Sequence, residues 1–278
     1  TARQVNDEVL RWLPEAGDHP WFVFVNYFDA HGPYFPPEPF NSLFADASSG
    51  RYWIGDGGAD ASAFSEVELT ELRDRYDNAI AYADYQLEQL LFRLEARGEL
   101  NNTMVIVTSD HGELFGEGGR VGHGAGRHLH LVHVPLVILP PGGPGQSLRV
   151  STPVTLRDVP ATVTSMTHPG EPSPFPGRPL SRFWVGEGRT GQPLGIDTVV
   201  AENGGSKFVV TDRYYYSYEP AGNVERLYDL VADPLVAEDI SRSPRGRTVI
   251  TDFRAYLRDH GLYIRPTSAG DSTRLPWR

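Results

Sequence analysis

The chain has 278 residues, of which 40% are hydrophobic, so it can bury a sizeable core as one large domain or two unequal ones. A formal net charge of -11 excludes an extended basic face for nucleic acid, and no apolar run approaches the ~20 residues of a membrane span. The absence of cysteine excludes disulfides, thiolate metal sites and a cysteine nucleophile within these residues. An anionic substrate would therefore need local positive charge, from a metal ion or from a few arginines and histidines.

The first hundred residues predict helices separated by a strand and a long loop. Apolar residues with helical spacing predict an N-terminal helix, and the run WFVFVNYF predicts a strand at 21–28. The stretch 29–64 is rich in proline, glycine, serine and aspartate, which is typical of a functional loop or an insertion. The sequence SEVE at 65–68 fits a helix capping box, and helical spacing continues from there to a stop at Gly98.

The middle of the chain predicts two more strands and a helix. TMVIVT at 103–108 and VPLVILP at 134–140 read as strands buried on both faces, and a helix is expected at 155–167 with Thr155 as its cap. Past residue 195 the pattern changes to short strand candidates, TVVAE, KFVVT, YYYSYE and LYDLVADP, before a final amphipathic helix at 247–259.

This order of elements predicts an α/β fold. Strands that alternate with helices predict a mainly parallel sheet flanked by helices, and successive short strands predict a small C-terminal antiparallel sheet plus a helix. We therefore expect a larger α/β domain at 1–194 and a small antiparallel subdomain with its tail at 195–278.

Residues that could bind a metal or take part in catalysis follow the predicted strands, which is where ligands bind in open α/β sheets. Asp110 and His111 follow the strand at 103–108, and together they offer a divalent cation one carboxylate and one imidazole. A single Asp-His dipeptide is more often an ordinary turn. His31 after an earlier strand and His123 in the glycine-flanked GHGAG shift the balance towards a shared site.

Four segments carry a family resemblance: PWFVFVNYFDAHGPYFPP, NNTMVIVTSDHGELFGE, GHG followed by HVPLVILPPG, and RLYDLVADP. In this order they resemble the successive motifs of the sulfatase family, within the alkaline-phosphatase-like superfamily. The resemblance runs from about residue 1 to 260 and implies a partial alkaline-phosphatase-like fold.

The resemblance also implies roles for individual residues. Asp110 and His111 would bind one divalent metal ion, for which Ca²⁺ is the first expectation and Mn²⁺ or Mg²⁺ the alternatives. Asp-His in place of the usual Asp-Asn is similar to the choline-sulfatase and phosphonate-monoester-hydrolase branches. His31 would lie beside the transferred group, and His123 would contact a sulfate oxygen near the leaving group. Glu113 would support these residues.

Other histidines are expected to have structural roles, at a sheet edge or an interface: His128, His130 and His133. Relatives often have a histidine where this chain has Gly118 in GEGG.

The expected nucleophile is missing from these residues. Sulfatases make formylglycine from the first residue of a C/S-x-P-x-R motif and bind the metal with two adjacent aspartates, and this chain has no such pair. The nearest match, PFPGR at 174–178, has Pro174 at the position of the nucleophile. We therefore expect the chain to be the C-terminal part of a longer enzyme, inactive alone, with formylglycine upstream.

Three functions stay open from the sequence. The first is a metal-dependent sulfuric ester hydrolase for small-molecule or glycan sulfate esters. The second is a phosphoric ester or phosphonate hydrolase, or a phosphotransferase, on the same scaffold. The third is a non-catalytic module that keeps a vestigial half-site. The substrate pocket is expected from 32–64 and 114–130. No nucleic-acid partner is expected.

Overall fold

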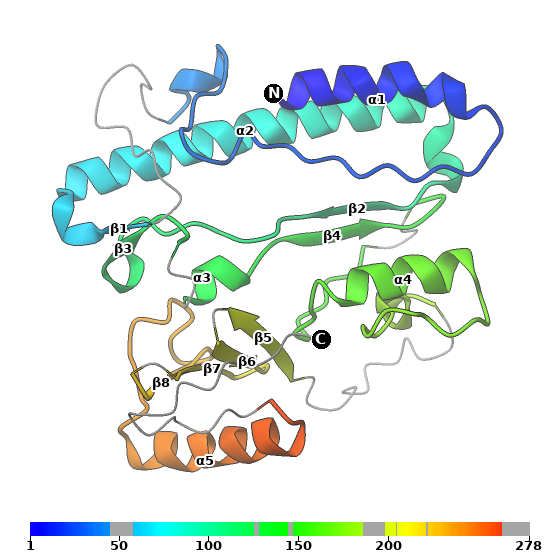
Figure 1. Cartoon of the computed structure of the whole chain (residues 1–278). Coiled ribbons are helices and arrows are strands. Elements are labelled where there is room, and N and C mark those ends of the chain that lie inside the picture. Colours follow the sequence, from blue (N-terminus) through cyan, green and yellow to red (C-terminus); the bar gives the residue numbers. More distant parts are fainter. Residues whose placement is uncertain are drawn as a thin grey trace. The chain divides into compact units, whose positions relative to one another are not determined.

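The computed structural model describes residues 1–44, 58–124, 128–143, 147–185, 198–203, 205–220 and 222–262 (Figure 1). The helices are α1 (Ala2–Ala16), α2 (Glu66–Ala96), α3 (Leu129–Val132), α4 (Asp158–Thr167) and α5 (Pro244–Asp259). The strands are β1 (Ala59–Asp60), β2 (Val105–Thr108), β3 (Arg120–Val121), β4 (Leu136–Leu139), β5 (Val199–Asn203), β6 (Ser206–Val210), β7 (Tyr214–Glu219) and β8 (Val224–Asp229).

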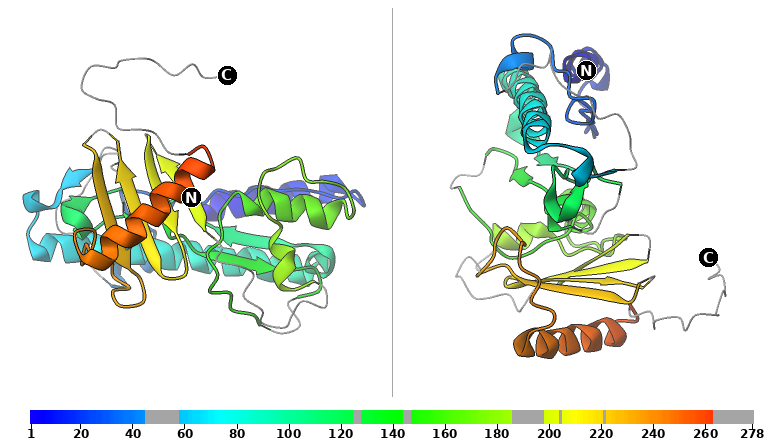
Figure 2. Two further views of the ribbon diagram at one scale, coloured as in Figure 1. Left: turned by 90° about the horizontal axis from the view of Figure 1, so that it is seen from below. Right: turned by 90° about the vertical axis from the view of Figure 1, so that its left-hand side faces the viewer.

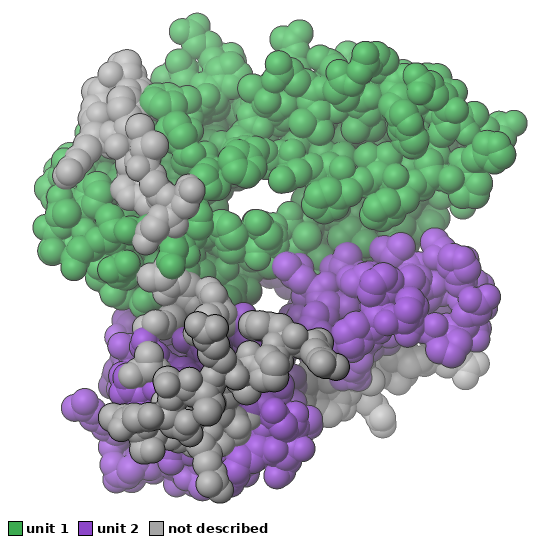
Figure 3. All heavy atoms as spheres, viewed as in Figure 1, with its two compact units in different colours: residues 1–147 green, residues 148–278 purple. Residues whose placement is uncertain are grey.

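The chain divides into two compact units, residues 1–147 and residues 148–278 (Figure 3). The domain boundary predicted between 194 and 195 lies outside the described residues and stays a prediction. Among the helices of the described residues, none is long and apolar enough to cross a membrane.

Helices α1 and α2 pack together in the first unit and confirm the two N-terminal helix predictions. Leu13 of α1 is buried in a cluster with Leu90 and Leu94 of α2. The contact also has a polar bond, because the Asn6 side-chain amide donates to the main-chain oxygen of Gln86 at 2.7 Å. Both groups are buried, so this hydrogen bond satisfies donors and acceptors that water cannot reach.

The start of α2 confirms the predicted capping box. The Glu68 amide donates to the Ser65 hydroxyl oxygen at 3.3 Å, and the Ser65 amide donates to the Glu68 carboxylate at 2.8 Å. Two amides at the helix start, which would otherwise lack partners, are thereby satisfied by neighbouring side chains. Beyond α2, Gly98 adopts a φ of 76°, the left-handed conformation that favours glycine after a helix.

The strands of the first unit differ from the predicted arrangement. β2 and β4 form where expected but pair antiparallel, with Val105 opposite Leu139 (Figure 1). Each strand pair among the described residues is antiparallel, so the predicted parallel pairing does not occur there. Neither strand is buried on both faces, since Thr108 and Val137 are exposed.

The strand predicted at 21–28 does not form. The segment is paired with no strand among the described residues, and Phe22 and Phe24 are 76% and 82% exposed. Apolar, β-branched and aromatic residues make a strand only where a neighbouring strand takes up their backbone hydrogen bonds.

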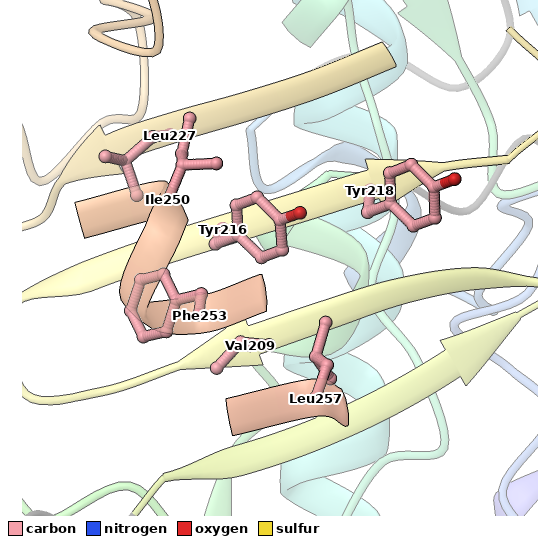
Figure 4. Packing of buried hydrophobic residues seen from close by; sticks show 7 residues of the cluster. All are labelled: Val209, Tyr216, Tyr218, Leu227, Ile250, Phe253 and Leu257. Atoms are coloured by element: carbon pink, nitrogen blue, oxygen red, sulfur yellow. The ribbon is translucent and has the colours of Figure 1, made fainter. Parts of the chain in front are cut away.

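The second unit contains the predicted antiparallel sheet and its helix. The strand order is β5-β6-β7-β8, and α5 lies across one face of the sheet (Figure 2). The buried side chains between them come from three strands and from α5 (Figure 4): Val209, Tyr216, Tyr218, Leu227, Ile250, Phe253 and Leu257. This core confirms the small C-terminal antiparallel sheet plus helix.

Helix α4 begins later than predicted. Its first residue is Asp158, and Thr155 lies in the turn before it, where its hydroxyl oxygen accepts from the Arg157 amide at 3.4 Å. Pro160 therefore falls in the first turn of the helix, where a missing amide hydrogen costs little.

An ion pair connects α5 to the sheet. The guanidinium Nε of Arg254 donates to Glu225 Oε1 at 2.8 Å, and the Tyr216 hydroxyl donates to the same oxygen at 2.5 Å. Burial raises the pKa of Glu225, but the hydrogen bonds from Arg254 and Tyr216 outweigh it, so the pKa is below its ordinary value. The ionised carboxylate therefore stabilises the folded second unit.

We expect Glu225→Gln to lower the free energy of unfolding by about 1–2 kcal/mol at pH 7, because hydrogen bonds to a charged group are lost. Because the pKa of Glu225 is lower in the folded state, its carboxylate contributes fully to stability above its unfolded-state pKa of about 4.3. This stabilisation is lost as the pH falls through the folded-state pKa. Urea unfolding at pH 7 and pH 3 measures the difference, with the exposed Glu238→Gln as control. An equal difference between wild type and Glu225→Gln at both pH values would contradict the role of charge.

Candidate active site

Three segments of the first unit bring together histidines from different parts of the sequence. His31 follows the extended segment 21–28, His111 follows β2, and His123 follows β3. The His111 and His123 rings are stacked with centroids 4.5 Å apart, and the His31 ring meets His123 edge-on at 5.2 Å. His123 thus lies between the other two imidazoles, and the structure places these predicted site residues together.

Gly112 allows the loop after β2 to turn close to the backbone that precedes β4. Its amide donates to the Leu131 oxygen at 2.9 Å. A Cβ on Gly112 would lie 2.0 Å from the His130 main-chain oxygen, which is too close for any side chain. Since Gly112 lies between His111 and Glu113, this close contact fixes the backbone positions of both residues.

Each of the three imidazoles uses the same ring nitrogen to contact a protein oxygen. His31 Nδ1 is 2.8 Å from the Gly32 oxygen, His111 Nδ1 is 2.9 Å from the Gly112 oxygen, and His123 Nδ1 is 3.1 Å from Glu113 Oε1. These oxygens accept, so Nδ1 carries the proton in each ring. Nε2 is then the nitrogen that can serve a metal ion or a substrate.

A buried hydrogen-bond chain orients His123. The Glu113 side chain is 3% exposed, and it also accepts from the Tyr34 hydroxyl at 2.9 Å. Burial raises the pKa of Tyr34, and the negative charge of Glu113 raises it further, so Tyr34 stays protonated and donates. A carboxylate held by two donors has a fixed position, and it holds the His123 ring in one orientation. The hydrogen bond between Glu113 and His123 is consistent with the supporting role expected of Glu113.

Tyr34 is the site residue that sequence reasoning missed. It belongs to the HGPY motif with His31, which was the available signal. Its ring is buried and meets the Tyr76 ring edge-on with centroids 5.4 Å apart, so α2 supports it from behind.

The predicted metal ligands lie side by side at the exposed edge of this cluster. The Asp110 and His111 side chains are 87% and 41% exposed, and Asp110 Oδ2 is 3.8 Å from His111 Nε2. Two bonds of about 2.4 Å reach across such a gap, so these atoms fit a shared divalent cation. Among the described residues, no further carboxylate or imidazole joins them to make a group of at least three donors. They are therefore two ligands of an incomplete set.

Three further histidines, which were expected at a sheet edge or an interface, lie in or beside a short helix. His130 belongs to α3, and His128 and His133 flank it. A Cβ on Gly118 would lie 1.8 Å from His128 Cε1, and Gly118 has a φ of +59°. The His128 ring thus occupies the space that a side chain at position 118 would need.

The chain is similar to known proteins in sequence and in fold. The model of the Sulfatase family matches residues 2–169. The choline-sulfatase of Rhizobium meliloti (strain 1021) is 27% identical over an alignment 287 residues long, and the alignment covers 93% of this chain and 54% of that protein. The arylsulfatase of Clostridium perfringens (strain 13 / Type A) is 23% identical over an alignment 258 residues long, and the alignment covers 86% of this chain and 53% of that protein.

A solved structure shares the fold. The crystal structure of the phosphonate monoester hydrolase of Agrobacterium radiobacter matches with a TM-score of 0.70 and 24% identity, over 91% of this chain and 59% of that one. The chain spans about half the length of these two curated relatives.

Proposed function

The chain belongs to the sulfatase family, and we propose on that basis that it is the C-terminal part of a metal-dependent sulfuric ester hydrolase. The observation that carries the proposal is the imidazole cluster, in which buried Glu113 fixes His123 between His31 and His111. The substrate class would be sulfate monoesters of small molecules or glycans.

The cluster can perform the parts of sulfuryl transfer that need hydrogen-bond donors and proton transfer. In its imidazolium form, with the Nδ1 proton held by Glu113, His123 would carry a second proton on Nε2 and donate it to the leaving-group oxygen as the bond to sulfur breaks. In its imidazolium form, with the Nδ1 proton on the Gly32 oxygen, His31 would donate a hydrogen bond from Nε2 to an oxygen of the transferred group. The adjacent Phe28 ring stacks on His31 at 4.5 Å and restricts its rotation.

Asp110 and His111 would hold one side of a divalent cation, whose positive charge would stabilise the sulfuryl oxygens. Ca²⁺ is the first expectation, with Mn²⁺ or Mg²⁺ as alternatives. The nucleophile would be a formylglycine supplied by a segment outside these residues, because the chain has no cysteine and PFPGR has Pro174 at the corresponding position. The relatives' greater length supports such a segment.

A second candidate is a phosphonate or phosphoric ester hydrolase, or a phosphotransferase. It is favoured by the Asp110-His111 pair and by the fold shared with a phosphonate monoester hydrolase. A phosphate monoester dianion demands more positive charge than a sulfate monoester monoanion. The described cluster offers imidazoles and no lysine, since Lys207, the only lysine, lies on β6, and this favours the sulfate ester. A non-catalytic module is the third candidate.

We expect the polypeptide extended by its upstream segment to hydrolyse 4-nitrophenyl sulfate with a higher kcat/KM than matched phosphate or phenylphosphonate esters. Steady-state kinetics on the three esters measures the preference. The 278-residue chain alone is the control, and it should show no enzyme-like turnover because an attacking group is absent. A phosphate or phosphonate preference of several orders of magnitude would favour the second candidate. Undiminished turnover by the chain alone would overturn the proposed fragment.

A further inference from the structure

The first unit contains a cavity that is lined by two helices. Its volume is about 600 Å³, and its wall comes from α1, α2 and the segment 37–40 (Figure 1). The residues that each helix contributes recur every three or four positions, so they share one face of that helix. Sites for small molecules typically have volumes of about 300–1,000 Å³. The cavity is therefore large enough for a ligand.

Two polar side chains of α2 in this wall are buried and have unused hydrogen-bonding groups. Tyr82 is 3% exposed and Gln86 is 8% exposed, and they lie one helical turn apart. Within the described part of the chain, neither the Tyr82 hydroxyl nor the side-chain nitrogen of Gln86 forms a hydrogen bond. Neither atom is sealed off by protein, so a ligand can reach both from the cavity. Buried polar groups need such a partner.

The Gln86 side chain is held in place by α1. The side-chain amide of Asn6 donates to the main-chain oxygen of Gln86 at 2.7 Å and contacts its Oε1 at 3.4 Å. With Oε1 occupied, the amide nitrogen is the atom of Gln86 that remains to donate to a ligand. A donor that is positioned before a ligand arrives loses less entropy when it binds one.

Aromatic rings form another part of the wall. The Phe40 ring packs against the Tyr82 ring with centroids 5.5 Å apart and against the Tyr85 ring with centroids 5.2 Å apart. Tyr85 is 41% exposed, so a ligand can contact its ring. The face of an aromatic ring carries partial negative charge, which attracts C–H groups that carry partial positive charge. This part of the wall suits a ligand with a flat face of C–H groups.

The charged residues of the lining balance one another. Arg3 and Asp7 come from α1, Glu38 from the segment 37–40, and Arg93 from α2. All four are exposed, and none of them forms an ion pair within the residues that the structure describes. Guanidinium groups only donate hydrogen bonds and carboxylates only accept them. A ligand that uses both kinds needs groups that donate and accept, and it gains nothing from a net charge.

We propose that this cavity binds a pyranose ring of an uncharged saccharide. Sugar hydroxyls both donate and accept, which matches the mixed polar groups of the lining, and the C–H face of a pyranose matches its aromatic rings. The cavity contains no residue of the imidazole cluster, so the proposal does not depend on the proposed hydrolytic function.

Saturation-transfer difference NMR, with cellotriose titrated into the 278-residue chain, tests the proposal. Tyr82→Phe should weaken binding about 3–10-fold, because it removes one hydrogen bond to the sugar. It should leave the melting temperature unchanged, since that hydroxyl has no partner within the described residues. Tyr85→Ala should weaken binding by at least about 5-fold, because it removes the exposed ring.

Two matched control variants lie outside the lining. Tyr228→Phe removes a hydroxyl from a half-buried tyrosine of β8, and Phe92→Ala removes a ring from an exposed position of α2. Both should leave the affinity for cellotriose unchanged. Circular dichroism confirms that each variant is folded.

Titrations with glucose and glycerol complete the test. Equal affinity for glucose and cellotriose would identify a single ring as the ligand, and tighter binding of cellotriose would identify a chain of sugars; either result supports the site. Glycerol has hydroxyls but no ring, so glycerol binding as tightly as glucose would overturn the proposal. Absence of cellotriose binding at about 10 mM would overturn it, and so would equal affinities of Tyr85→Ala and Phe92→Ala.

Discussion

His123→Ala, in the polypeptide that includes the upstream segment, is expected to lower kcat for an aryl sulfate by about 10²–10⁴-fold. The reason is the position of the ring, which lies between His31 and His111 with Nδ1 held by buried Glu113. A proton donor to a leaving group acts mainly in the transition state, so KM should change far less than kcat.

The controls for this experiment separate a chemical role from a structural one. His19→Ala removes an equivalent imidazole from an exposed position after α1, and it should leave kcat and KM unchanged. Glu113→Gln keeps the shape of the side chain but weakens its hold on His123, so it should lower kcat by a smaller factor. Melting temperatures of the variants show whether the loss of activity is a loss of folding. Equal kcat for His123→Ala and His19→Ala would exclude His123 from the reaction.

Elements fixed by local chemistry could be predicted from the sequence. The capping box at Ser65 and Glu68 needs only residues within one helical turn, and the structure forms it as expected. The short strands after residue 195 were predictable because turn residues separate them and each pairs with its neighbour in sequence.

Elements that depend on distant partners could not be predicted. The run at 21–28 has the composition of a strand, yet it is unpaired, because no described strand lies beside it to take its backbone hydrogen bonds. The antiparallel direction of β4 against β2 could not be predicted either, since an apolar run reads the same in a parallel and an antiparallel pair.

The candidate site also has features that could be predicted and features that could not. Because His31 and Asp110 each follow an apolar run, the sequence predicted that the loops containing them lie close together. The hydrogen bond from Tyr34 to Glu113 could not be predicted, because it joins residues 79 positions apart and depends on how both side chains are buried.

The second large effect concerns the metal. In the extended polypeptide, Asp110→Ala is expected to weaken divalent-metal affinity by at least about 100-fold, since even loss of a residue that merely supports a ligand costs about 10–100-fold. His111→Ala should act similarly, because its Nε2 lies 3.8 Å from Asp110 Oδ2 and its Nδ1 is already on the Gly112 oxygen. Elemental analysis after dialysis measures occupancy directly, without reference to activity.

The same measurement identifies the metal and tests the incomplete ligand set. Ca²⁺ prefers oxygen ligands, so the imidazole of His111 disfavours Ca²⁺ at this site. If elemental analysis finds manganese instead of calcium, the imidazole ligand determines which metal binds. The exposed Asp18→Ala, which removes a carboxylate far along the sequence from the cluster, should keep full occupancy. The 278-residue chain alone should retain little metal, because its described residues bring together only two of the donors. Full occupancy in Asp110→Ala would remove Asp110 from the site, and stoichiometric metal in the 278-residue chain would show that these residues hold a complete one.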